Sequence, residues 1–284
     1  MDGTNGNSQA IVGTISGTSV SFGSATTFTT AYSPDISISY DANANKILIS
    51  FEDVANSNYG SAIVGTVSGT SISFGSKAVY EAANGSFNSS VYDSNNQKVV
   101  IVYGEGFIAG YSSAVNATIS GTSVSFTSPF QLSATYNNPM MITFDSANKK
   151  VVEAYADSGG SKSLVYTPPG TETNLTATNL LGLAPEAISN TATGTINTWG
   201  SRCENSSFLG TGPSAGANAT YAPTPDDPYR YSMCYDTAND KVVIAYNDEA
   251  NNYYLYACVG TVTGNAISWG TVVAVDETAA MDQI

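Results

Sequence analysis

Four acidic residues recur at matching positions along the 284-residue chain, at intervals of 52, 52 and 91 residues. A tyrosine stands six residues after the acid in three copies, and Ser163 stands there in the third copy. A phenol ring can stack on the C–H face of a sugar, and carboxylates can accept hydrogen bonds from its hydroxyls. We therefore predict a ligand-binding set, suited to carbohydrate, that consists of Tyr59, Tyr111, Tyr254, Asp53, Glu105, Asp157 and Asp248.

The same residues also fit a structural role. Each tyrosine would then begin a strand and pack between neighbouring repeat units, while each acid would cap a turn. Residue types and spacing alone leave both roles open.

Catalytic chemistry has little support in the sequence. The chain has no histidine, so a Ser-His-Asp or Cys-His arrangement cannot be built. Glycoside hydrolysis needs two carboxyl groups in unlike environments, whereas the repeat gives these acids similar ones. A sialidase-type site would need a cluster of arginines, and the chain has only Arg202 and Arg230. We predict that the protein is not an enzyme, with glycan depolymerase activity as the least favoured alternative.

Neither a cofactor nor a metal site is expected. The three cysteines, Cys203, Cys234 and Cys258, are odd in number and match no zinc spacing. Cys234 and Cys258 stand at strand positions that valine holds in another copy, so we expect buried free thiols. The alternating Asp and Asn at 41–45 are similar to the start of a calcium loop, but the central glycine is missing.

The composition limits the possible partners. Charged residues make up 11% of the chain, against about 25% in an ordinary soluble domain, and the net charge is −14. Such a field repels phosphate backbones and anionic lipid, so binding to nucleic acid is not expected. An apolar run long enough to span a membrane is also missing, and no signal peptide is visible.

A repeat with a period of 52 residues organises the chain. The segment "AIVGTVSGTSISFGS" at 62–76 recurs at 10–24 and, with changes, at 114–128, and its phenylalanines Phe22, Phe74 and Phe126 mark the period. A period of this length is typical of a structural unit that stacks on its own copies.

A second repeated segment, with the pattern D-x-x-x-x-K, alternates with the first. Asp41, Asp93 and Asp145 keep the period, but Asp236 follows 91 residues later, which exceeds one period by 39. We infer an insertion in the third unit, at about 171–228, and expect the second half of that unit to be lost or rebuilt around "SKSLVYTPPG".

Each unit is predicted to hold four antiparallel strands. In the first strand Ile36, Ile38 and Tyr40 alternate with serines, as in a half-buried strand, and the second strand is a continuous apolar run. D-x-x-x-x-K and "SGTS" are typical of tight turns. These features favour an all-β, propeller-like array of four-stranded blades.

The predicted domain is a single one, 1–284, divided into a half blade at 8–30, blades at 34–82 and 84–134, a degenerate blade at 137–228 and a blade at 229–280. The ring would close by pairing its two ends if the opening half completes a blade begun elsewhere. An open stack and a fragment of a longer ring are the alternatives.

The repeat "YDANANKILISFEDVANSNYGSAIVGTVSGTSISFGS" at 40–76 resembles the propeller-like repeats of tail-fibre and other virion-surface proteins of marine tailed bacteriophages. The segment at 174–200 is similar to a short module that accompanies those repeats. Together the likenesses cover most of residues 8–275.

The resemblance implies a non-enzymatic virion-surface adhesin, of tail-fibre type, that attaches to a host-surface glycan or protein. The alternative is a structural decoration or assembly module of a phage particle. Implied partners are a host receptor and other virion proteins, with a homo-oligomer as an analogy to tail fibres.

Overall fold

The structure is a computed structural model that describes residues 6–105, 111–133, 140–157, 160–168, 215–222, 231–248 and 251–277. This part of the chain is all-β and forms antiparallel sheets, and the second and third strands of one unit are joined by a short 3-10 helix, η1 (Val54–Asn56). The all-β class predicted from the sequence is confirmed.

One repeat unit, unit 1, shows the strand pattern. β5 (Ser37–Asp41) pairs with β6 (Lys46–Asp53), which pairs with β7 (Tyr59–Ser68). The outer edge of β7 is covered in two pieces, by β8 (Ser71–Phe74) and by the beginning of β9 (Ala78–Asp93). The fourth strand is therefore broken in the middle.

The same order of strands recurs in three more units, and an N-terminal half unit has only the equivalents of the third and fourth strands. Unit 2 contains the end of β9, β10 (Lys98–Glu105), β11 (Tyr111–Ser120), β12 (Ser123–Phe126) and β13 (Phe130–Ser133). Unit 3 contains β14 (Met140–Asp145), β15 (Lys150–Asp157), β16 (Gly160–Tyr166) and β17 (Ala219–Thr220). Unit 4 contains β18 (Tyr231–Asp236), β19 (Lys241–Asp248), β20 (Tyr254–Thr263), β21 (Ala266–Trp269) and β22 (Val273–Asp276). The half unit contains β1 (Ser8–Ala10), β2 (Gly13–Ser16), β3 (Ser19–Phe22) and β4 (Thr26–Thr29).

Strand β9 belongs to two units at once. Its first residues pair with β7 of unit 1, and residues from Gly85 onward pair with β10 of unit 2. The boundary predicted between 82 and 84 therefore lies inside a continuous strand of 16 residues. Units 1 and 2 share one nine-stranded sheet as a result.

Unit 3 recovers its fourth strand after the insertion. β17 pairs with β16, and Tyr166 forms a bridge with Ala215. The Gly216 amide donates to the Val165 carbonyl at 2.8 Å, as the Gly75 amide donates to Val64 at 2.9 Å in unit 1. Residues 215–222 thus belong to the unit rather than to the insertion, which corrects the expected range of 171–228. The part of the insertion at 171–214 lies outside the described residues.

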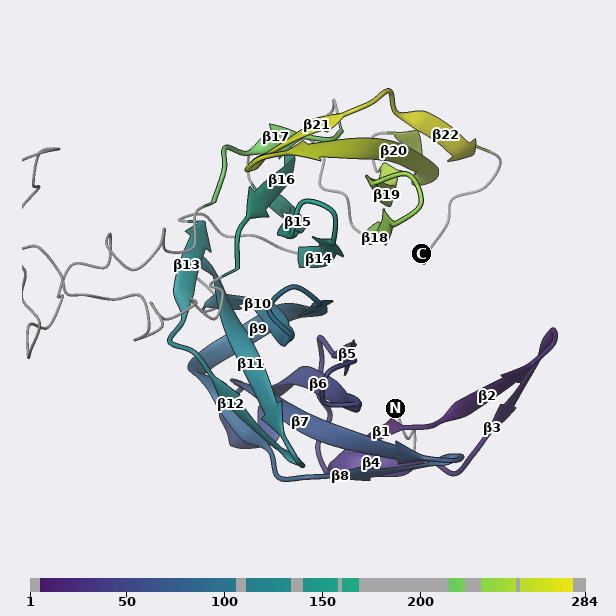
Figure 1. Cartoon of the computed structure of the whole chain (residues 1–284), viewed down its shortest axis with the longest axis vertical. Coiled ribbons are helices and arrows are strands. Elements are labelled where there is room, and N and C mark those ends of the chain that lie inside the picture. The colour runs from purple at the N-terminus through teal and green to yellow at the C-terminus, as the bar shows by residue number, and fades with distance from the viewer. Residues whose placement is uncertain are drawn as a thin grey trace, which may run out of the picture.

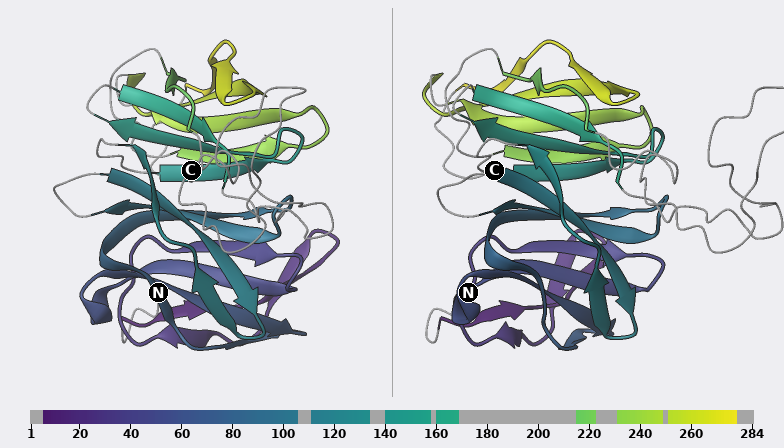
Figure 2. Two further views of the ribbon diagram at one scale, coloured as in Figure 1. Left: turned by 60° about the vertical axis from the view of Figure 1, so that its left-hand side comes forward. Right: turned by 90° about the vertical axis from the view of Figure 1, so that its left-hand side faces the viewer.

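The units follow one another along an arc (Figure 1). Side views show their sheets lying next to one another, from the purple N-terminal strands to the yellow C-terminal strands (Figure 2). The two ends of the arc do not meet: β1 pairs with β4, and β22 pairs with β20. Within the described residues the ends therefore do not close a ring, in contrast to the closure considered from the sequence.

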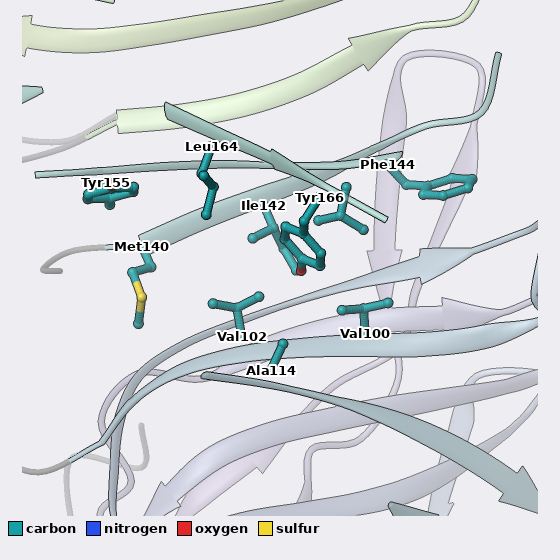
Figure 3. Packing of buried hydrophobic residues seen from close by; sticks show 10 residues of the cluster. Val100, Val102, Ala114, Met140, Ile142, Phe144, Tyr155, Leu164 and Tyr166 are labelled. Atoms are coloured by element: carbon teal, nitrogen blue, oxygen red, sulfur yellow. The ribbon is translucent and has the colours of Figure 1, made fainter. Parts of the chain in front are cut away.

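Apolar side chains fill the space between successive units. Between units 2 and 3, Val100 and Val102 of β10 lie under Met140, Ile142 and Phe144 of β14 (Figure 3). The second strand of unit 2 is therefore covered on both faces, as its continuous apolar sequence predicts. Its alternate residues Val99 and Ile101 belong to a second cluster, shared with unit 1.

A close backbone contact recurs where one unit meets the next. A Cβ added to Gly23 would overlap the carbonyl oxygen of Thr70, and Gly75 has the same relation to Thr122. A Cβ added to Gly216 would likewise overlap the carbonyl oxygen of Asn265. Each glycine thus lets a unit approach the "SGT"-type turn of the following unit.

An aromatic pair accompanies this contact. Phe28 meets Phe74, Tyr80 meets Phe126, and Tyr221 meets Trp269, each edge-on with ring centroids 5.8 to 5.9 Å apart. The first ring of each pair comes from the fourth strand of one unit, or for Tyr221 from the residue directly after it, and the second ring comes from the next unit. The 52-residue period therefore repeats an interface as well as a fold.

The predicted turns are confirmed. Oδ1 of Asp41 accepts the amides of Asn43 and Ala44, each at 2.9 Å. Asp93, Asp145 and Asp236 cap their turns in a similar way. The glycines of the other turn have positive φ angles: Gly17, Gly69, Gly121 and Gly264.

β5 is a half-buried strand, as its alternation predicts, but its apolar side is the exposed one. Ser39 is buried, whereas Ile36, Ile38 and Tyr40 are 43%, 59% and 52% exposed. Ser37 and Ser39 lie against Ser90 of unit 2, at 2.9 and 2.8 Å between hydroxyl oxygens. The apolar face therefore points toward the N-terminal half unit, which has no first or second strand to cover it.

The two described cysteines differ in exposure. Cys258 is buried, and burial raises the pKa of its thiol to about 12. Cys234, expected to be buried, is exposed. It stands in β18 at the position of Val91, which packs against unit 3, whereas no described unit follows unit 4. Cys203 lies outside the described residues.

Replacing Gly75 by valine should separate units 1 and 2. The new side chain would meet the Thr122 backbone, which cannot move aside cheaply, so the free energy of unfolding should fall by about 1 to 3 kcal/mol. Gly270→Val is the matched control, because a Cβ there meets only the carbonyl oxygen of Val259 in its own unit, at 3.3 Å. If urea unfolding shows that both variants lose the same free energy of unfolding, the contact between the units is contradicted.

The turn at Asp236 should respond to acid. Hydrogen bonds from the Asn239 side chain, the Ala238 amide and the Asn239 amide lower the pKa of the Asp236 carboxyl. A lowered folded-state pKa means that the stabilisation is complete above the unfolded-state pKa and is lost as the pH falls through the folded-state pKa. NMR titration should place this carboxyl below an ordinary aspartate, and Asn239→Ala should raise its pKa. An unchanged pKa in that variant would show that the amide side chain has no such effect.

Candidate functional site

The hairpins between the second and third strands bring each acid opposite its tyrosine. Asp53 is the cross-strand partner of Tyr59, and Asp248 is the partner of Tyr254. Glu105 and Tyr111 stand in the same register, though their side chains lie outside the described residues. The spacing of six therefore reflects a loop of five residues between paired positions.

Unit 3 departs from this arrangement. Its hairpin is closed by Asp157 opposite Gly160, so its loop has two residues, 158 and 159. The side chain of Asp157 lies outside the described residues. Ser163 pairs with Ala154, donates to the Ala219 carbonyl at 3.0 Å and accepts from Trp269 Nε1 at 2.8 Å. Equal sequence spacing was misleading here, because the shorter loop moves Ser163 into the buried strand.

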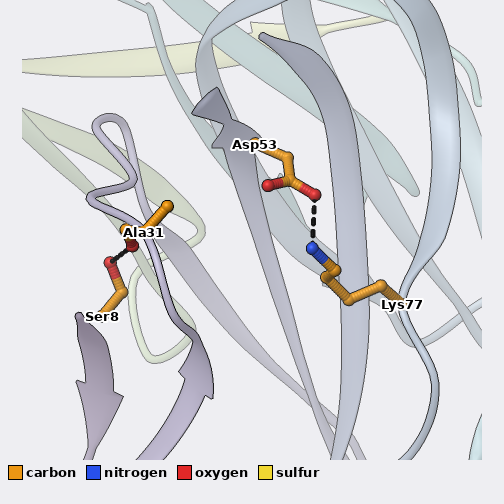
Figure 4. Close-up of polar contacts among 4 residues, drawn as sticks. All are labelled: Ser8, Ala31, Asp53 and Lys77. Carbon is orange, nitrogen blue, oxygen red and sulfur yellow. Dashed lines mark hydrogen bonds and ion pairs between the residues drawn. The ribbon is translucent and has the colours of Figure 1, made fainter. Parts of the chain in front are cut away.

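Asp53 is buried and paired with a base. Lys77 Nζ lies 2.6 Å from its Oδ2 in the ion pair shown in Figure 4. The Lys77 side chain is 38% exposed and that of Asp53 only 2%. Within the described residues, Oδ1 has no hydrogen-bond partner. This carboxylate therefore supports its own unit through the segment that follows β8.

Asp248 forms hydrogen bonds within its own loop. Its Oδ2 accepts from Asn251 Nδ2 at 2.6 Å, and its carbonyl accepts from the Tyr253 amide at 2.9 Å. The neighbouring Asn247 donates to the Tyr253 carbonyl at 3.0 Å. Equivalent backbone bonding occurs in unit 1, where the Asn58 amide donates to Asp53 at 3.1 Å. The Asp248 side chain thus stabilises its own turn, as the structural alternative proposed, whereas the Asp53 side chain makes no capping hydrogen bond in its loop.

The tyrosines of the predicted set are only partly accessible. Tyr59 and Tyr254 are half-buried at the beginnings of β7 and β20. Tyr253, which the sequence reasoning missed, is 39% exposed and has a left-handed backbone with φ of 58°. Its position matches Asn58, at φ of 61°. Tyr253 could have been identified from the sequence as the last residue of the loop.

In these hairpins, the residues that fix the loop ends therefore differ from the exposed residues at the loop tips. Asp53, Asp248, Tyr59 and Tyr254 hold the loop ends, while exposed residues at 54–57 and 251–253 form the tips. In the described residues, no cluster of histidine, cysteine, aspartate or glutamate could hold a metal ion. What the tips offer is amide, hydroxyl, phenol and backbone groups.

The chain matches no protein-family profile, and a comparison with curated proteins finds no significant match. Among the described residues, no helix is long and apolar enough to cross a membrane.

The Asp53–Lys77 pair should stabilise unit 1. Lys77→Met leaves a buried carboxylate without its cation, and we expect a loss of about 1 kcal/mol, a low value because Lys77 is partly in water. Combining it with Asp53→Asn should recover part of that loss in a double-mutant cycle of urea unfolding. Additive losses would mean that the two side chains do not interact.

Proposed function

We propose that the units are blades of a propeller-like array and that the domain is a non-enzymatic adhesin. It would bind a host-surface glycan, or a host protein, through the hairpin tips between the second and third strands. Three observations support this architecture. The strand order recurs, the same glycine contact and aromatic pair recur between units, and the units follow an arc (Figure 1).

The observation that carries the proposal is the contrast between constant loop ends and changing loop tips. Three units have an acid opposite a tyrosine, but the residues between them read "VANSN" at 54–58, "GFIAG" at 106–110 and "EANNY" at 249–253. A rigid framework that presents variable loops on one side is typical of binding proteins. The repeated acids and tyrosines thereby serve recognition by positioning the tips.

The chemistry of the tips favours a neutral glycan. Asparagine amides and serine hydroxyls both donate and accept, as sugar hydroxyls do, and Tyr253 adds an exposed ring for stacking. A net charge of −14 disfavours phosphate-rich or strongly anionic surfaces. The likeness of the repeat to virion-surface proteins of marine phages supports a place on the outside of a phage particle.

Cell binding tests this function. Labelled protein would be incubated with candidate marine hosts, before and after periodate treatment of the surface glycans. Tyr253→Ala should weaken binding about tenfold, equivalent to about 1.4 kcal/mol. Tyr40→Ala is the matched control, because Tyr40 is 52% exposed but lies beside the turn at the other end of β6.

Equal effects of the two substitutions would contradict the assignment to the tips. The triple variant Tyr59→Ala, Tyr111→Ala, Tyr254→Ala tests the set predicted from the sequence. Binding that survives periodate would point to a protein receptor instead of a glycan.

A second candidate function is assembly with other virion proteins. The N-terminal half unit favours it, because Ile15, Val20 and Phe22 are 77%, 53% and 67% exposed. An apolar surface of this kind is typical of a protein-binding face. A complex with tail or capsid components, without binding to any host that supports infection, would favour this candidate.

A further inference from the structure

The N-terminal half unit has an unpaired sheet edge where every other unit has a second strand. β7 lies between β6 and the β8–β9 strands, and β11, β16 and β20 likewise have neighbours on both sides. β1 pairs with β4 and β2 with β3, and their other edge has no partner in the described part of the chain. Such an edge presents unpaired N–H and C=O groups to a strand that can be added.

The repeat shows what pairs at this edge. Gly13 corresponds to Gly65 one period later, and Val12 corresponds to Val64. In unit 1 these two residues pair with Ile47 and Leu48 of β6. An antiparallel apolar strand in the same register is therefore the complement of β1 and β2.

A second surface borders the same place. The exposed residues Ile36, directly before β5, and Ile38 and Tyr40 within it correspond, two periods on, to Met140, Ile142 and Phe144 of β14. Those three are only 3%, 7% and 7% exposed, because Val100 and Val102 of the preceding unit pack against them. The close-up in Figure 3 shows this packing, which β5 lacks.

The half unit itself is held in place. The Ser8 hydroxyl donates to the Ala31 carbonyl at 3.2 Å (Figure 4) and accepts the Ser33 amide at 3.1 Å. Phe28 packs against Phe51 of β6, with ring centroids 5.3 Å apart. The unpaired edge therefore belongs to strands that are held in place. What the half unit lacks is a first and a second strand beside that edge.

We propose that this edge and the β5 face together bind a two-stranded β-hairpin supplied by another polypeptide. The hairpin would have the form of the first half of this repeat, with a D-x-x-x-x-K turn and an apolar second strand. It would add to β1 and β2 by backbone pairing and cover Ile36, Ile38 and Tyr40.

The occupant is a different chain, not a second copy of this one. In the described residues, β6, β10, β15 and β19 are paired along both edges, so a second copy has no spare second strand. The proposal does not depend on glycan binding. It gives the assembly function a specific surface and a partner of defined chemistry.

A peptide from unit 2 is the best probe. Residues 86–105, "SFNSSVYDSNNQKVVIVYGE", contain the hairpin whose Phe87 and Val91 pack against the apolar face of β14. The same side chains should suit the exposed face of β5. Hydrogen exchange of the full chain, with and without this peptide, reports on the edge directly.

We expect the amides of β1 and β2 to exchange at least about tenfold more slowly with saturating peptide, since pairing protects them from solvent. A peptide with Val100→Pro and Val102→Pro should not protect them, because proline cannot complete the ladder. In the protein, Ile38→Asp should abolish protection. Val273→Asp is the matched control, because Val273 is as exposed as Ile38, at 59%, but lies in unit 4.

Three results would overturn the proposal. These are no protection by the peptide, equal protection by the proline-containing peptide, or equal loss with Ile38→Asp and Val273→Asp. Protection without peptide that rises with protein concentration would show that a second copy occupies the edge, which also contradicts the stated occupant.

A covalent version covers the case in which the free peptide does not fold. Fusing residues 86–105 ahead of residue 6 through a flexible linker raises the effective concentration of the hairpin. This fusion should raise Tm by several degrees relative to the same fusion with the two prolines. Identical Tm values would show that the edge does not accept this hairpin.

Discussion

Every unit depends on its neighbours to cover the second strand. This strand is apolar on both faces, and its own sheet can cover neither of them. Val100 and Val102 face β14 of unit 3, while Val99 and Ile101 face unit 1. The close approach that this needs is provided where Gly75 meets the Thr122 carbonyl. Burial in this chain is therefore a property of pairs of units, and the ends of the arc carry its exposed apolar surface.

The interfaces achieve this burial with different chemistry. Units 2 and 3 meet through apolar side chains. In contrast, β5 and β6 of unit 1 contact β9 of unit 2 through hydroxyl and amide groups. Ser50 donates to Asn88 at 2.6 Å, and Ser90 lies within hydrogen-bond distance of both Ser37 and Ser39. Buried hydroxyls that bond one another avoid the cost of an unpaired polar group. A chain so rich in serine and asparagine can thus remain well packed with few charges.

The sequence predicts most of the unit and less of its surroundings. Period, turns and strand order follow from local chemistry, as the αL position of Asn45 and the positive φ of Gly69 illustrate. The direction of β5 could not be predicted from alternation alone, because Ile38 is exposed only when the preceding strands are missing. Ser163 was misplaced because a loop shorter by three residues shifts the register without changing the spacing. Among the candidate site residues, the predicted pairing of acid and tyrosine reflects hairpin closure, and Tyr253 emerges only from backbone geometry.

The continuous strand β9 has a mechanical consequence. Tension along the chain between units 1 and 2 passes through a strand bonded to β7 on one half and to β10 on the other. Separating the two units therefore requires one of these two hydrogen-bonded ladders to shear before the chain between the units can extend. Units 3 and 4 share no strand in the described residues, so under load their contact rests on side-chain packing and on individual hydrogen bonds, such as that from Trp269 Nε1 to the Ser163 hydroxyl. We therefore expect load to separate units that share no strand before it separates units 1 and 2.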